Sequence, residues 1–320
     1  MNNYTTHLHN QLLKNRGIIS YLEHRGLTLK TIKKFQIGLA LSKKEELPYL
    51  LENKDYHIQM GNLKINDEGV FEPTFSNRVV IPLANDKGEI VGFTGRTISD
   101  IAGRFLNHNQ KNFGDFINKK KYKIAKYLNT IETKYFKKSN ILFNSHRVKT
   151  RYCWIVEAQL SAIGVHQTVN QSVMATGGTA FTESHLALLK QKGITDVCLA
   201  LDPDKAGYNA TYKTAMMLIN ANFRVMVAVL PKGSDPMDMI QANEVKELEE
   251  ILYNPRTGVK FLVDYFNHQH KNLSKFKYIQ EVEKFFNQVN IKNANTLIAN
   301  PKPKSIGWFI NRAMGVKNER

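Results

Sequence analysis

Cysteine is scarce in this sequence of 320 residues, which contains only two. Cys153 and Cys198 cannot form a disulfide framework or a multi-cysteine zinc site, so we expect no zinc within this chain. Both lie in short apolar runs, which predicts buried free thiols in a reducing compartment. The cysteine content therefore indicates a cytoplasmic protein.

Long apolar runs are absent as well. No segment of about 18 consecutive apolar residues occurs, which argues against a helix that spans a membrane. Residues 1–17 lack the apolar stretch of a secretory signal. The basic residues are not gathered on one long amphipathic helix, so we expect no membrane partner.

Acidic residues are few compared with basic ones: 28 Asp and Glu stand against 45 Lys and Arg, which gives a formal net charge of +17. Because like charges oppose compaction, this excess favours a polyanionic partner. Residues 111–151 alone hold twelve Lys and Arg and two acids. Aromatic residues are interleaved there: Phe113, Phe116, Tyr122, Tyr127, Tyr135 and Phe136. Rings stack on unpaired bases while cations follow phosphates, which predicts single-stranded nucleic acid; the alternative is a solvated basic face.

The hydrophobic pattern changes twice along the chain. Residues 4–35 have helical spacing with Thr28 as a candidate N-cap, and residues 75–98 predict two strands around a turn at 85–88. Residues 99–125 are polar and predict a loop. From 152 to about 230, short strands alternate with helices, and after 244 the pattern is helical, with a last short helix at 304–314. Alternating strands and helices predict βαβ units and a mostly parallel sheet.

The predicted fold class is therefore α/β combined with α+β. We expect an N-terminal mixed α+β basic subdomain at 1–150, a central domain at 151–242 with a mostly parallel sheet and flanking helices, and a helical C-terminal subdomain at 243–320.

Five carboxylates follow the predicted strands of the central domain. Glu157 follows the first strand, Asp202 and Asp204 the third, and Asp235 and Asp238 the fourth. The carboxyl ends of parallel strands share one edge of a sheet, where ligands bind. Hard oxygen ligands gathered there suit Mg²⁺ or Mn²⁺. The alternative for a single acid, Asp204, Asp235 or Asp238, is helix capping.

Two turns stand out beside these acids. Gly177, Gly178 and Thr179 lie between a strand and a helix, where backbone N–H groups can hold a phosphate; the alternative is that the glycines serve only the turn. In the run Leu-Asp-Pro-Asp-Lys-Ala-Gly, Pro203 fixes a bend and Gly207 permits a close approach of the following helix.

Seven segments, in order, resemble the RNA-polymerase core of bacterial-type or bacteriophage-encoded replicative DNA primases, which is built around a TOPRIM domain. They are residues 21–40, 77–96, 125–143, 154–167, 173–189, 199–210 and 230–240, and include Val-Glu-Ala-Gln-Leu-Ser, Leu-Asp-Pro-Asp and Ser-Asp-Pro-Met-Asp. The resemblance implies that residues 151–242 form the TOPRIM metal-binding catalytic domain and that residues 1–150 bind template.

The resemblance also implies roles for single residues. Glu157, Asp202 and Asp204 would be catalytic acids and metal ligands, joined by Asp235 and Asp238 in binding metal. A basic cleft that holds template or incoming nucleotide would contain Arg78, Arg96, Lys126, Asn129 and Lys138. Three positions depart from the family pattern. Ala158 stands where the family has glycine, and Ser161 and Met237 stand where it has aspartates, with Asp238 one place later. No cysteine-rich zinc module precedes residue 20, so we expect a separate zinc-domain protein to supply it, if one is used.

The expected function is template-directed synthesis of short RNA primers from NTPs on single-stranded DNA, with Mg²⁺ or Mn²⁺. The expected partners are a replicative helicase and either a separate zinc-domain protein or a single-strand-binding protein. The expected place is the cytoplasm, or the host cytoplasm if the protein is encoded by a phage. One alternative is an inactive TOPRIM protein that only binds single-stranded DNA. Another is a TOPRIM nuclease.

Overall fold

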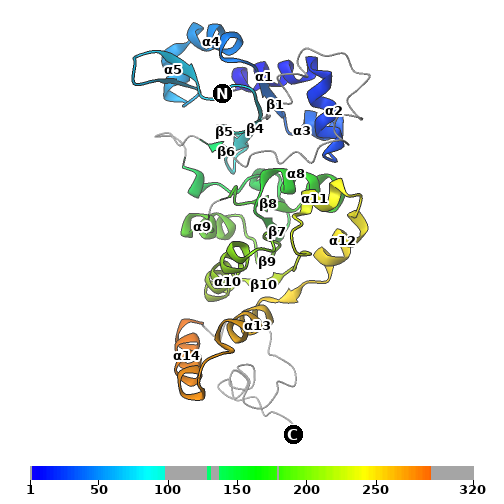
Figure 1. The fold of residues 1–320 in the computed structure, drawn as a ribbon, viewed down its shortest axis with the longest axis vertical. Coiled ribbons are helices and arrows are strands. Elements are labelled where there is room, and N and C mark those ends of the chain that lie inside the picture. The colour runs from blue at the N-terminus through cyan, green and yellow to red at the C-terminus, as the bar shows by residue number, and fades with distance from the viewer. Residues whose placement is uncertain (1, 98–127, 131–136, 179, 290–320) are drawn as a thin grey trace.

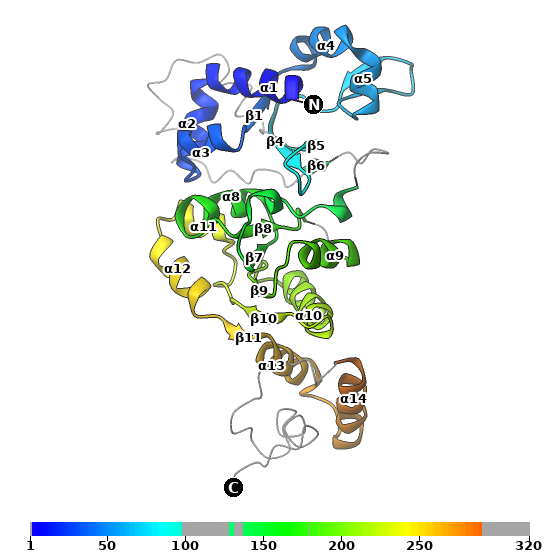
Figure 2. The ribbon, with the colours of Figure 1, turned by 180° about the vertical axis from the view of Figure 1, so that it is seen from behind.

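The computed structural model describes residues 2–97, 128–130, 137–178 and 180–289 (Figure 1). The predicted loop at 99–125 and the predicted helix at 304–314 lie outside these ranges. In both views the N-terminal elements form one end of the elongated molecule, and α13 and α14 lie at the other (Figures 1 and 2).

The N-terminal part begins with three helices that confirm the expectation for residues 4–35: α1 (Asn2–Lys14), α2 (Arg16–His24) and α3 (Leu29–Lys34). Side-chain caps define the starts of α2 and α3. Asn15 Oδ1 accepts the N–H of Ile18 at 3.0 Å, and Thr28 Oγ1 accepts the N–H of Thr31 at 3.2 Å. Thr28 is thus the N-cap that the sequence predicts.

An antiparallel sheet of order β1-β4-β5-β6 follows, formed by β1 (Gly38–Ala40), β4 (Arg78–Ala84), β5 (Ile90–Thr97) and β6 (Leu128–Thr130). The β4–β5 hairpin is the one predicted over 75–98. Gly88 has a φ of +87°, and the N–H of Asn85 donates to the carbonyl of Glu89 at 2.9 Å. Between β1 and β4 lie α4 (Lys43–Glu52), α5 (Lys54–Gln59) and the small hairpin β2 (Leu63–Ile65) and β3 (Phe71–Pro73).

The central part contains the mostly parallel sheet that the alternating pattern predicts. Its order is β11-β10-β9-β7-β8, from strands β7 (Tyr152–Val156), β8 (Val173–Ala175), β9 (Asp196–Leu199), β10 (Arg224–Val227) and β11 (Arg256–Thr257). The 3₁₀ turns η2 (Lys138–Asn140) and η3 (Ser145–Arg147) lead into it. The helices are α8 (Gln159–Thr168), α9 (Glu183–Gln191), α10 (Lys205–Asn220), α11 (Pro236–Gln241), α12 (Val245–Tyr253), α13 (Gly258–His270) and α14 (Lys275–Gln288).

The expectation that the chain is helical throughout after residue 244 is wrong at β11. This two-residue strand pairs antiparallel with β10, with Met226 opposite Thr257. No local pattern marks it, because two residues show no periodicity and the pairing depends on a partner thirty residues earlier in the chain.

The helices cover two faces of the sheet. On one face, every second residue of the strands, such as Trp154, Val156 and Cys198, packs in one hydrophobic cluster with α8, α11 and α12. Residues of the opposite parity, such as Ile155 and Leu199, pack with α9, α10 and α13. The helix after β7 therefore covers one face and the helix after β9 the other. This makes the β7–β9 boundary a topological switch point.

One hydrophobic cluster joins the N-terminal part to the sheet. It runs from Leu22 and Ile32 through Val79 and Ile81 of the hairpin to α8 and α11. In both views α8 and α11 lie between α2–α3 and the sheet (Figure 2). Here the side-chain amide of Gln167 accepts the N–H of Thr28 and donates to the carbonyl of Gly26, each at 2.8 Å.

Close backbone approach allows this packing. Gly26 has a φ of +92°, and a Cβ added there would lie 2.8 Å from Ile240 Cγ2. A Cβ at Gly164 would lie 2.7 Å from Ile240 Cδ1 and 2.9 Å from Met237 Sδ. α11 is thus held between two glycines, one from each part of the protein.

Buried polar and thiol groups carry clear pKa shifts. Cys153 and Cys198 are buried free thiols, as predicted, and burial raises the pKa of each. Burial also lowers the pKa of His146, His166 and His185 to about 4. His185 is fully buried, and its Nδ1 accepts the N–H of Thr182 at 3.2 Å, which requires a neutral ring.

We predict that acid destabilises the fold between pH 6.5 and about 4. In this window the unfolded chain binds protons that the folded histidines do not, so stability falls as the pH falls, by about 1.4 kcal/mol per pH unit for each such histidine. Urea unfolding at pH 7 and pH 5 measures the slope. His185→Gln keeps an acceptor for the cap and should remove one histidine's share; identical slopes in both proteins contradict the assignment.

Candidate active site

The acidic edge of the sheet lies at the switch point. β7 and β9 pair in parallel with Ile155 beside Leu199, and the N–H of Ala200 donates to the carbonyl of Ile155 at 2.9 Å. Glu157 follows β7 directly, and Asp202 follows β9 three residues after its end. Parallel pairing therefore delivers both acids to the same edge, as the sequence predicts.

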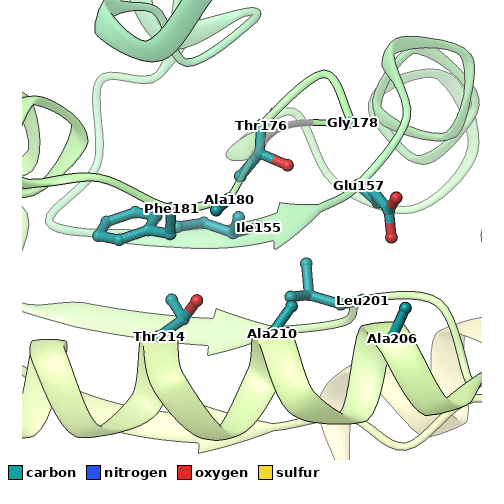
Figure 3. A pocket seen from close by; sticks show the side chains of 10 residues that line it. All are labelled: Ile155, Glu157, Thr176, Gly178, Ala180, Phe181, Leu201, Ala206, Ala210 and Thr214. Carbon is teal, nitrogen blue, oxygen red and sulfur yellow. The ribbon is translucent and has the colours of Figure 1, made fainter.

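Glu157 borders a cavity of about 190 Å³ between the sheet and α10 (Figure 3). The far walls are mostly apolar and include Ile155, Phe181, Leu201 and Ala210. The glutamate carboxylate lies at the opposite end from Phe181 (Figure 3). Glu157 is half-buried and is not an N-cap, because Ala158 holds that position for α8. Capping therefore does not account for this acid.

Asp202 is fixed by a close contact with α10. A Cβ added at Gly207 would lie 1.9 Å from the carbonyl oxygen of Asp202, so glycine alone fits at this position, as predicted from the sequence. The Oδ1 atom of Asp202 is buried. Asp204 caps α10 instead, with Oδ1 accepting the N–H of Gly207 at 2.7 Å. The capping alternative thus describes Asp204 but not Asp202.

Asp235 and Asp238 start α11. Oδ1 of Asp235 accepts the N–H groups of Met237 at 2.7 Å and Asp238 at 2.9 Å, and Asp238 completes the capping box with Oδ2 3.4 Å from the N–H of Asp235. Asp238 is exposed and lies 3.9 Å from a guanidinium nitrogen of Arg25. Both acids therefore have a capping role.

Among the residues that the structure describes, no three His, Cys, Asp or Glu side chains form a ready-made metal cluster. The acids nevertheless fit Mg²⁺ or Mn²⁺, because the donor atoms are hard carboxylate oxygens on neighbouring strands. Such ions keep several waters and are commonly held by one or two carboxylates together with substrate phosphates. Glu157 and Asp202 are positioned to do this because they follow the adjacent parallel strands β7 and β9. Asp204 and Asp235 each use one oxygen in a cap.

The glycine pair beside this edge does not offer its N–H groups to a phosphate. The N–H groups of Gly177 and Gly178 donate to the carbonyl of Glu157 at 2.8 and 3.3 Å, and both residues have positive φ. The pair closes the turn after β8, which is the alternative reading of this motif. Thr179 lies outside the described residues.

Lys138, one of the predicted cations that the structure describes, lies beside this turn. Its Cε atom would be 3.9 Å from a Cβ added at Gly177, and its side chain is half-buried. Since Gly177 is hydrogen-bonded to Glu157, Lys138 lies on the same rim as the predicted catalytic glutamate. Lys126 lies outside the described residues, and the backbone of Asn129 pairs with Gly95 in β5.

The two predicted cleft arginines are not brought together. In the β4–β5 register Arg78 is opposite Thr97, and Arg96 is opposite Val79. Successive side chains of a strand point to opposite faces, so Arg78 and Arg96 lie on different faces of the hairpin. Arg96 shares the face of Val79, which packs in the cluster that includes α8 and α11.

Arg96 belongs to a group that links the two parts of the protein. The pKa of Arg96 is lowered mainly by burial. The nearby Arg25 lowers it further, whereas Tyr21 and the carboxylates of Asp235 and Asp238 raise it. Sequence reasoning missed Arg25, which follows α2 and lies near Asp238. The only sequence signal for Arg25 as a site residue was its position inside the segment 21–40. Its contact with Asp238 depends on how α2 packs near α11, which the sequence does not show.

Comparison with known proteins identifies the family. A family model described as "DNA primase catalytic core, N-terminal domain" matches residues 5–149, and one described as "Toprim-like" matches residues 154–240. The chain belongs to the DNA primase catalytic-core family. A Toprim-like domain within this fold generally implies the use of a divalent metal ion.

Two DNA primases illustrate the similarity in sequence. The DNA primase of Helicobacter pylori (strain ATCC 700392 / 26695) is 33% identical over 256 residues, covering 77% of this chain and 41% of its own length. That of Rickettsia bellii (strain RML369-C) is 32% identical over 239 residues, covering 71% and 36%. The chain thus spans about two fifths of the length of these primases.

Solved primase structures show the same fold. A DnaG primase catalytic domain bound to ssDNA superposes with a TM-score of 0.76 at 21% identity, covering 98% of this chain and 93% of that one. The catalytic core of Escherichia coli primase gives a TM-score of 0.74 at 23% identity, covering 98% and 95%.

Met237 and Ser161, which replace aspartates of the primase pattern, are both buried here. Met237 is 1% exposed and packs against Gly164 and Gly26, so it fills the contact between α8, α11 and the N-terminal part. Ser161 is 1% exposed in α8. Because an ionised aspartate at position 237 would be buried among apolar groups, the methionine suits this packing.

We predict that Gly207→Ala destabilises this primase core by about 3 kcal/mol, because the new Cβ clashes with the Asp202 carbonyl. Gly193→Ala is the matched control. It has a φ of +69° and open space around its Cα, so it should cost only about 1 kcal/mol of backbone strain. Urea unfolding measures both, and equal losses would show that the Asp202 backbone moves aside freely.

Proposed function

We propose that this chain synthesises short RNA primers on a single-stranded DNA template by metal-dependent nucleotidyl transfer. The observation that carries the proposal is the position of Glu157 and Asp202 at the switch point of a Toprim-like sheet, within a primase catalytic core. We also propose that residues 1–150 bind template, that residues 151–242 hold the metal and that residues 243–320 form a helical subdomain.

The acids would together form a binding site for Mg²⁺ or Mn²⁺. When bound, such an ion would supply Lewis-acid stabilisation of the phosphates and of the attacking 3′-hydroxyl. Glu157 and Asp202 would hold it from two neighbouring strands, with Asp204, Asp235 and Asp238 at the outer side of the site. The apolar wall of Leu201 and Phe181 would limit the access of water to Glu157 from the α10 side.

Cations at the rim would bind the nucleic acid and the nucleotide. We propose that Lys138 and Arg96 approach nucleotide phosphates from the two sides of the acidic edge. We also propose that Lys126, Asn129 and Arg78 extend the template path, with Arg78 outside the nucleotide site because it lies on the opposite face of the hairpin from Arg96. The net charge of +17 supports a polyanionic partner. A solved neighbour of similar fold is bound to ssDNA. A replicative helicase, a zinc-domain protein and a single-strand-binding protein stay predicted partners.

We predict that Glu157→Gln and Asp202→Asn each lower primer synthesis by about 10²–10³-fold, the usual effect of removing an electrostatic group that acts in the transition state. The assay uses single-stranded DNA, labelled NTPs and Mg²⁺ or Mn²⁺. Glu183→Gln, an exposed acid in the first turn of α9, is the control and should leave synthesis unchanged.

The same variants separate the alternatives. Binding of single-stranded DNA in EDTA should be unaffected, because neither carboxylate contacts the strand without a metal. If both variants synthesise primers at the rate of the unmodified protein, Glu157 and Asp202 are not the catalytic acids. Cleavage of labelled DNA without NTPs would favour a nuclease, and binding that ignores metal and NTPs, without synthesis by the unmodified protein, would favour an inactive accessory protein.

We predict different effects for the two arginines of the hairpin. Arg96→Gln should raise the KM for NTPs or lower synthesis by about tenfold, as expected for a lost charged hydrogen bond. Arg78→Gln should change the KM for NTPs by less than about twofold, because Arg78 lies on the opposite face from the acids and is proposed to contact template only. Steady-state synthesis at varied NTP concentration and saturating template tests this, and equal increases in the KM for NTPs would mean that both faces contact the nucleotide.

A further inference from the structure

The first turn of α9 contains two polar residues to which the proposed chemistry assigns no role. Thr182 is the N-cap of this helix, and its Oγ1 atom accepts the N–H of His185 at 3.3 Å. In return, the Nδ1 atom of His185 accepts the N–H of Thr182 at 3.2 Å. The two side chains therefore fix each other in a closed capping box.

Thr182 also holds η2, the 3₁₀ turn that carries Lys138. The hydroxyl of Thr182 donates to the carbonyl of Ser139 at 2.7 Å. One hydroxyl group thus uses a lone pair for the cap of α9 and its proton for the middle residue of η2. This bond joins α9 to η2, although its two residues are 43 positions apart in the chain.

His185 adds a second contact with η2. Its ring is fully buried, and because Nδ1 accepts a hydrogen bond, the proton of the neutral ring is on Nε2. Nε2 makes no hydrogen bond of standard geometry with the described residues. The backbone carbonyls of Lys138 and Ile141 nevertheless lie beside the ring, since they oppose the lowering of its pKa by burial. The His185 ring therefore packs against the backbone of η2.

The chain that follows η2 is fixed separately. Phe143 forms an isolated antiparallel bridge with Ala175 of β8, with N–H to carbonyl distances of 2.8 and 3.2 Å in the two directions. Leu142 between them is buried. The part of this segment that leads to the sheet is thus held by β8, whereas the turn with Lys138 is held by α9.

The side chain of Lys138 extends from η2 towards the acidic edge. Its Cε atom would lie 3.9 Å from a Cβ added at Gly177, whose N–H donates to the carbonyl of Glu157 at 2.8 Å. A lysine side chain is a flexible four-carbon stem, so the position of its ammonium group depends on how well its backbone is fixed. The contacts between α9 and η2 therefore influence where this charge lies.

We propose that Thr182 and His185 are positioning residues for Lys138. They hold η2 so that the Lys138 ammonium lies on the rim of the acidic edge, where the phosphates of an incoming nucleotide would bind. The proposal rests on the proposed function, because it concerns the same site. Neither residue touches the nucleotide, and each acts through the backbone of η2. The alternative is that the pair only stabilises the fold.

Steady-state synthesis at varied NTP concentration and saturating template tests the proposal. Lys138→Ala should raise the KM for NTPs about tenfold, as expected for a lost charged hydrogen bond. Thr182→Val and His185→Leu should each raise it about fivefold, because the ammonium is displaced but not removed. The conservative variants Thr182→Ser and His185→Gln keep the polar atoms and should stay within about twofold of the unmodified chain.

Two comparisons separate positioning from a general loss of stability. Adding Thr182→Val or His185→Leu to Lys138→Ala should raise the KM by less than about twofold more, because no ammonium is left to position. Thr257→Val is the matched control, since Thr257 caps α13 by accepting the N–H of Lys260 at 3.2 Å. It should lower the thermal midpoint comparably to Thr182→Val and leave the KM for NTPs unchanged.

A second readout does not depend on catalysis. Acylation of lysine side chains by an amine-reactive reagent, followed by mass spectrometry, reports how accessible Lys138 is. Lys138 is half-buried, so Thr182→Val and His185→Leu should increase its labelling rate severalfold. Lys246, a distant exposed lysine of α12, should be labelled at the same rate in every variant.

The outcomes are distinct. A raised KM together with faster labelling of Lys138 supports the proposal. It is overturned if Lys138→Ala alone raises the KM, if the effects of Thr182→Val and His185→Leu persist in full without Lys138, or if the labelling of Lys138 does not change. An unchanged KM in Lys138→Ala overturns it too and leaves primer synthesis intact. Faster labelling in a protein that, unmodified, makes no primers would support the positioning of Lys138 and overturn the proposed function alone.

Discussion

The packing of α8 and α11 against the N-terminal helices is the contact on which the rest of the arrangement depends. Ile240 and Met237 lie between Gly26 and Gly164, and a side chain on either glycine would force the two parts apart. Through this contact the hairpin face that carries Arg96 meets the acids at the start of α11. Two segments with opposite charge, distant in sequence, thus lie close to one another.

The acids of the central sheet combine structural roles with the metal-binding role proposed for them. Asp204 and Asp235 hold the first turns of α10 and α11 through one oxygen each. Capping fixes the direction of these carboxylates without using all of their lone pairs. Glu157 and Asp202, which are not N-caps, follow neighbouring strands at the switch point. Because only some of these carboxylates are not engaged in N-caps, they suit a metal ion that is also bound by substrate phosphates better than one bound by protein ligands alone.

Both hydrophobic clusters of the central sheet cross the proposed domain boundaries. Residues of α2, α3 and β4 share one with α8 and α12, and α13 and α14 share the other with β9 and α10. Boundaries at 150 and 242 therefore separate stretches of sequence with different proposed roles. They do not separate independent hydrophobic cores, so motion between the parts would have to break buried apolar contacts.

The sequence alone determined the elements whose signals are local: the Thr28 cap, the β4–β5 hairpin, the alternation that forms the parallel sheet, and the glycine at 207. It also placed Glu157 and Asp202 at one edge, because parallel strands fix where their ends lie. Only the tertiary structure decided that Arg78 and Arg96 face apart, that Gly177 and Gly178 bond to Glu157, that β11 pairs with β10, and that Met237 is buried. These outcomes depend on register and packing between distant segments, which leave no periodic trace in the chain.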